Sequence, residues 1–229
     1  MRWAHLPDRK YAGAHATWIM TYYKFLRFKN GQVISDWDES VWERGEWRDI
    51  AIGPVLQAQG FYATERIADA VPWLGNVLAE VEVRGLSVAG NIVTAHQGMR
   101  ITHAWKFGRQ DWVELAIHAA GLVLPIFESR FPDDKRPRAA LQSGSAAAAA
   151  RAAGEAADIG ARSAGHAARA AAAAADARTR TADAAAYAAL AVNSADGAAH
   201  GICPALRADV RDKIEAWLHE RIRSMESVW

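Results

Sequence analysis

A stretch made mostly of alanine, which follows Arg138 and runs to about Ala191, constrains this chain more than any other feature. Alanine has the highest intrinsic helix propensity, but burying an alanine side chain removes little apolar surface from water. One unbroken helix over residues 146–192 would be about 70 Å long at 1.5 Å per residue, too long for a compact domain. The stretch therefore predicts a bundle of shorter helices, with breaks expected near Gly154, Gly160 or Gly165.

Polar residues recur through the alanine stretch at steps of three or four, which predicts one polar stripe on a helical backbone. These charges are too frequent for a membrane span. The spacing favours ion pairs between Arg151 and Glu155 and between Asp158 and Arg162. The stripe includes Arg162, His166 and Arg169, which are candidate partner-binding residues. A histidine between two arginines is a poor metal ligand, so a solvated helix histidine is the simpler interpretation of His166.

Helices are also predicted on both sides of this stretch. Residues 110–128 carry a helical stripe of apolar side chains, and Pro125 within it predicts a kink or a helix end. Pro204 favours the start of a final amphipathic helix that runs to Met225.

The N-terminal region is built from different material. Of the 10 Trp, all but Trp217 and Trp229 lie at or before Trp112. An aromatic run over residues 19–28 leads to Asn30-Gly31, a strong hairpin signal, and then to a strand over 33–37. Residues 36–48 suggest a loop or short helix. Further strands are expected over 76–83, 91–94 and 99–105.

The prediction is an α+β chain with a mostly antiparallel sheet domain over residues 1–108 and an alanine-rich helical domain over 109–229. The charge is nearly balanced, with 27 Lys+Arg and 26 Asp+Glu, so nucleic acid is not indicated as a partner. The single Cys203 rules out an intramolecular disulfide. A soluble cytoplasmic protein without a cofactor or metal is expected, and nothing indicates a membrane partner.

The segment from Gly60 to Val83 offers an alternative, enzymatic site. Thr64 is a plausible N-cap for the following helix, and Glu80 and Glu82 form a Glu-x-Glu pair on an alternating strand. The segment resembles a phage-associated domain of unknown function and, more distantly, ADP-ribosyltransferase-like folds. That resemblance implies a nucleotide site at Tyr62, Thr64, Glu80 and Glu82. Strand alternation alone would also put both glutamates on one solvated face.

The loop before the alanine stretch contains Asp134, Arg136 and Arg138. Arginine binds carboxylate or phosphate in a bidentate fashion, so these residues are candidates for contacting a partner. An internal cluster of caps and salt bridges at the helix start is the alternative.

A family resemblance covers residues 110–192. It rests on four segments: Leu124-Pro125-x-Phe127-Glu128, Pro132-x-Asp134-x-Arg136-Pro137-Arg138-x-Ala140, Ala164-Gly165-His166-Ala167-Ala168 and Ala184-Ala185-Ala186-Tyr187-Ala188. In these the chain resembles alanine-rich immunity proteins of bacterial polymorphic toxin systems. The resemblance implies a non-enzymatic module that binds a protein partner, a toxin or effector. The alternatives are a nucleotide- or NAD-handling transferase and a phage-encoded assembly protein, which would form homo-oligomers.

Overall fold

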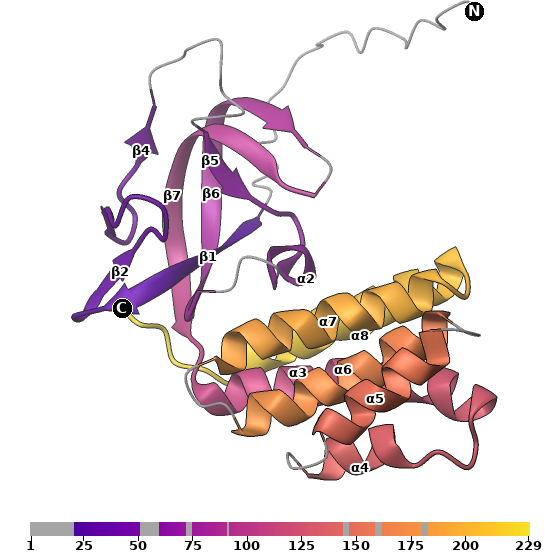
Figure 1. Ribbon diagram of the computed structural model, residues 1–229. Helices are drawn as coiled ribbons and strands as arrows, with labels where there is room; N and C mark the ends of the chain where they lie inside the picture. The colour runs from indigo at the N-terminus through magenta and orange to yellow at the C-terminus, as the bar shows by residue number, and fades with distance from the viewer. Residues whose placement is uncertain are drawn as a thin grey trace, which may run out of the picture.

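The computed structural model describes residues 21–50, 60–71, 75–90, 92–143, 147–158, 162–179 and 183–229. A curled antiparallel sheet forms the N-terminal half and a bundle of helices the C-terminal half (Figure 1). The predicted α+β fold class is therefore confirmed.

Three long strands make the centre of the sheet, in the spatial order β1 (Tyr22–Lys29), β6 (Val77–Ala89) and β7 (Thr94–Lys106). Four short strands extend it: β2 (Gln32–Ile34) and β3 (Val41–Trp42) beyond β1, and β4 (Arg48–Asp49) and β5 (Phe61–Ala63) along β7. Asn30 and Gly31 have φ of 53° and 82°, so the turn predicted between β1 and β2 is confirmed.

The strand boundaries differ from prediction in four places. The strand expected over 33–37 ends at Ile34, and the expected loop or helix over 36–48 contains β3 and the start of β4. The strand expected over 76–83 continues to Ala89 as β6. The strand expected over 99–105 lies within the longer β7, which includes only Thr94 of the strand expected over 91–94; Asn91 lies outside the described residues. A two-residue strand is too short to show a periodic sequence pattern, and its extended backbone is decided by the neighbouring strand with which it pairs.

Thr64 closes one end of the curled sheet instead of capping a helix. Its N–H donates to the carbonyl oxygen of Tyr23 at 2.9 Å, and the Tyr23 N–H donates back at 2.7 Å. Its hydroxyl donates to the carbonyl of Arg66, the residue before helix α2 (Ile67–Ala70). The expected cap role is therefore wrong, because the Glu215 carboxylate, distant in sequence, accepts the first N–H groups of α2.

Six further helices form the bundle: α3 (Arg109–Arg130), α4 (Arg136–Gln142), α5 (Ala147–Asp158), α6 (Arg162–Thr179), α7 (Ala184–His200) and α8 (Pro204–Arg223). The predicted C-terminal helix is confirmed as α8. The alternative that a helix ends before Pro125 is wrong, since α3 continues past it.

Two of the expected helix breaks lie inside helices. Gly154 is in α5 and Gly165 in α6, whereas Gly160 lies outside the described residues. A Cβ added to Gly154 would lie 3.1 Å from the carbonyl oxygen of Gly165. These glycines therefore let two helices approach closely, a use of glycine that competes with helix breaking.

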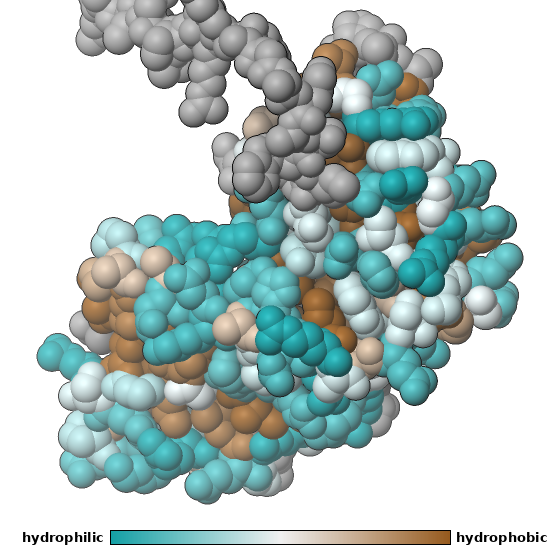
Figure 2. Space-filling model, turned by 180° about the vertical axis from the view of Figure 1, so that it is seen from behind, coloured by the Kyte–Doolittle hydropathy of each residue, from teal (hydrophilic) through white to brown (hydrophobic). Residues whose placement is uncertain are grey.

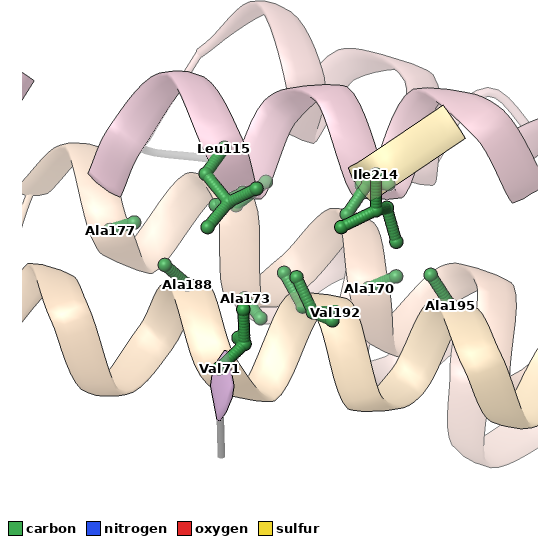
Figure 3. Close-up of a cluster of buried hydrophobic side chains, with 14 of the residues drawn as sticks. Val71, Leu115, Ala170, Ala173, Ala177, Ala188, Val192, Ala195 and Ile214 are labelled. Carbon is green, nitrogen blue, oxygen red and sulfur yellow. The ribbon is translucent and has the colours of Figure 1, made fainter. Parts of the chain in front are cut away.

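Helix α6 is the centre of the bundle and packs against α3, α4, α5 and α7. Most of its alanines are fully buried, so it lacks the single solvated face expected of a surface helix. Figure 3 shows how larger side chains fill the space between alanine helices: Leu115 of α3 and Ile214 of α8 point toward alanines such as Ala173 and Ala195. Small residues set the close spacing, and a few large ones supply the buried area.

One apolar cluster spans the sheet and the bundle, and a second is built from residues of the sheet. Phe25 and Leu78 of the sheet belong to the same cluster as Trp112 and Leu115 of α3. After α8 the chain returns to the sheet, where the Val228 N–H donates to the carbonyl oxygen of Ala104 at 2.9 Å. The domain boundary at residue 108 stays a prediction.

By length and composition α3 could cross a membrane. Its buried side chains pack in the bundle core, as in the core helix of a soluble protein.

Candidate functional site

The arginines at the start of α4 form ion pairs within the chain. Arg136 Nε donates to Asp134 Oδ1 at 2.9 Å, and Arg138 Nη2 donates to Glu128 Oε2 at 2.5 Å. These hydrogen bonds hold the pKa of the Asp134 and Glu128 carboxyls below their usual values. The interpretation as an internal salt-bridge cluster therefore matches the geometry, and partner binding by Asp134, Arg136 and Arg138 stays a prediction.

The predicted stripe on α6 is divided among different neighbours. His166 lies against Gly197 of α7, where an added Cβ would be 3.1 Å from Nδ1, and Arg169 lies against Gly154 of α5. Only Arg162, at the start of α6, is exposed. Tertiary packing separates the three, because α6 has helices on several sides.

Arg151 also differs from its predicted pairing. It forms an ion pair with Asp176 of α6, whose side chain is almost fully buried. An unpaired carboxylate costs more free energy in the core than on the surface, so the buried Asp176 gains more from a cation than the exposed Glu155 would.

Arg162 lies on a groove of about 510 Å³ at the end of the bundle. Apolar side chains form most of its lining: Leu122, Pro125, Ile126, Ile202 and Leu206. Ile202, between α7 and α8, is 55% exposed and adds apolar surface to the groove. Apolar surface is visible over the helical part in Figure 2, bordered by hydrophilic groups.

The charge of this groove is positive. Arg130 and Arg162 line it, and no acidic residue of the described part of the chain does. Among the described residues, neither arginine forms an ion pair with a carboxylate, and the side chain of Asp158, predicted to pair with Arg162, lies outside the described residues. An apolar groove that carries two arginines suits a partner with apolar side chains next to acidic ones.

A second pocket, of about 560 Å³, opens where the curled sheet is incomplete between β2 and β5. Tyr62 and Thr64 line it, together with Lys24 and Trp37, which the sequence did not single out. Lys24 Nζ donates to the carbonyl oxygen of Tyr62 at 3.1 Å, and burial lowers the pKa of Lys24 to about 8. The sequence signal that could have indicated Lys24 is the presence of a lysine in a predicted strand of mostly apolar residues.

The glutamates of the alternative site lie elsewhere. Glu82 Oε2 accepts from Arg100 Nε at 2.7 Å, and Glu80 Oε1 lies 3.8 Å from His103 Nδ1 on the neighbouring strand. Neither lines the pocket with Tyr62 and Thr64. The structure thus places the four predicted residues in two locations, and a transferase site stays a prediction.

A third cavity, of about 550 Å³, lies between the sheet and helices α7 and α8. Its charged side chains are paired across it: Arg207 Nη2 lies 2.8 Å from Asp196 Oδ2, and Arg211 pairs with Asp69 of α2. The Arg211–Asp69 pair joins the bundle to α2, whereas the Arg207–Asp196 pair lies within the bundle, between α8 and α7.

No group of three or more metal-ligating side chains is found in the described part of the chain. Cys203 Sγ accepts the Leu206 N–H at 3.4 Å and so caps α8. No protein-family model, curated protein or solved structure matches this chain. Its function must therefore be argued from its own surfaces.

Proposed function

We propose that this protein is a non-enzymatic, cytoplasmic protein-binding module of the immunity type, which binds a toxin or effector and occludes its working surface. The observation that carries the proposal is the groove of α3, α6 and α8, where an apolar lining adjoins Arg130 and Arg162 without a described carboxylate partner. Arginine and large apolar residues are frequent anchors of protein interfaces.

The groove favours a partner of particular chemistry. Ile202 and its apolar neighbours would bury a hydrophobic ridge, while the two arginines would pair with carboxylates beside that ridge. Two of the groove's walls are long helices packed into the core, so binding costs little conformational entropy.

Arg136 and Arg138 lie near the Arg130 end of α3, in ion pairs whose charges cancel. Because each already pairs with a carboxylate of this chain, we expect them to affect the rate of association more than affinity.

Affinity capture of the tagged protein from its native host lysate tests the proposal. Ile202→Asp is matched by Leu190→Asp, because Leu190 of α7 is 50% exposed and lies outside the groove. Arg130→Glu/Arg162→Glu is matched by Arg223→Glu, an exposed arginine of α8. We expect a stoichiometric partner that both groove variants lose and both controls retain.

Capture that survives both groove variants would refute this surface. A partner that proves to be a second copy of the chain, with a matching dimer mass by light scattering, would support the assembly alternative instead.

A further inference from the structure

Strand β1 has a gap along one edge. Its outer edge pairs with Thr64 at Tyr23 and with Ile34 at Arg27, but no described strand lies beside Phe25 between them. Outward-pointing main-chain groups alternate along an antiparallel strand, so Phe25 presents its N–H and C=O to this gap. The 560 Å³ pocket opens here, with Phe25 in its lining.

Lys24 brings a positive charge to the same pocket, whose lining also includes Asp36. The Lys24 ammonium group donates to the neutral carbonyl of Tyr62, and no carboxylate of the described chain lies within ion-pair distance of it. The acids that face it come from the loop after β2: Asp36 pairs with Arg27 at 3.0 Å, and Asp38 accepts from Ser40. Because Asp36 is already paired with Arg27, the Lys24 ammonium group remains available to an anionic ligand.

Two aromatic side chains at this pocket are exposed. Trp37 is 96% exposed and Tyr62 38%, so neither contributes much to the core. Both offer a flat apolar surface beside the Lys24 ammonium.

We propose that this pocket binds a small organic anion with a flat aromatic body, of the aromatic carboxylate or sulfonate class. The anionic group lies between the Lys24 ammonium and the Phe25 N–H, and the ring packs against Trp37 and Tyr62. This site is separate from the groove of α3, α6 and α8 and does not depend on the function proposed for it.

Fluorescence titration with the aromatic sulfonate 1-anilinonaphthalene-8-sulfonate tests the site. We expect one saturable site in the wild type, with affinity at least tenfold weaker in Lys24→Gln and several-fold weaker in Trp37→Ala. Lys29→Gln, a charge removal on the same strand, should bind as the wild type does. Ile202→Asp should also leave this site unchanged, which separates it from dye bound in the groove.

The pH dependence identifies the lysine as the anchor. With a pKa of about 8, the ammonium fraction of Lys24 falls from about 0.9 at pH 7 to about 0.1 at pH 9, so dye affinity should fall about tenfold. Lys24→Arg should keep the affinity and lose this pH dependence. Equal affinity in the wild type and Lys24→Gln, or the same pH dependence in Lys24→Arg, would overturn the proposal. A misfolded variant is recognised because it binds the dye more, at many sites.

Discussion

The Glu215 carboxylate of α8 holds the sheet to the bundle, and its removal should weaken the whole fold. Helix α2 has only four residues and no side-chain cap from its own segment. Glu215 Oε1 accepts from Ile67 N at 3.0 Å and Oε2 from Ala68 N at 2.7 Å, and the side chain is only 15% exposed. These N–H groups lie at a helix N-terminus, where negative charge is favourable.

The size of the effect follows from these contacts. A hydrogen bond to a charged group contributes about 1.5–3 kcal/mol, and partial contact with water reduces that. We therefore expect Glu215→Ala to lower the free energy of unfolding by about 2–4 kcal/mol. Glu215→Gln should cost about 1–2 kcal/mol, because the amide oxygen still accepts from one N–H. Glu220→Ala is the control, since Glu220 is 78% exposed and its ion pair should contribute less than about 1 kcal/mol.

Urea unfolding followed by circular dichroism and by tryptophan fluorescence measures these differences. The two probes should coincide in the wild type, because one apolar cluster spans the sheet and the bundle. If Glu215→Ala unfolds within about 0.5 kcal/mol of Glu220→Ala, the carboxylate does not couple the two parts and the reasoning is refuted.

Three further predictions concern single residues. Gly75→Ala should abolish or strongly destabilise folding, because its Cβ would lie 1.8 Å from the carbonyl oxygen of Leu26. Gly121 lies within α3 and has open space around its Cα, so Gly121→Ala should raise the free energy of unfolding, measured in urea, by about 0.5–1 kcal/mol. His96 is fully buried, and burial lowers its pKa to about 4. Between pH 6.5 and 4 the unfolded state therefore binds more protons than the folded state, so the free energy of unfolding should fall by up to about 3 kcal/mol as the pH is lowered over that range. The His96→Gln variant should lack this pH dependence. Burial also lowers the pKa of Lys24 from 10.5 to about 8, so the free energy of unfolding should rise between pH 8 and 10.5 in the wild type and stay flat there in Lys24→Met. If urea unfolding gives the same pH dependence for both proteins, the ammonium group is not buried.

Local chemistry determined much of the fold from the sequence alone. Asn30-Gly31 predicted its turn because only such residues readily adopt positive φ at both positions. The apolar periodicity after Pro204 predicted α8, whose Val210, Ile214 and Leu218 are buried. The compositional change near residue 108 matches the transition from sheet to helices, because aromatic residues favour strands and alanine favours helices.

Tertiary structure alone decided the candidate sites. Whether Arg162 is exposed while Arg169 packs against Gly154 depends on which helices surround α6, and spacing along one helix does not contain that information. The same holds for Lys24, which lines a pocket that opens where β2 and β5 leave a gap beside β1. A sequence pattern indicates the face of a helix or strand on which a residue lies, whereas a binding site also depends on what lies opposite that face. In this chain the opposite side is formed by residues far apart in sequence.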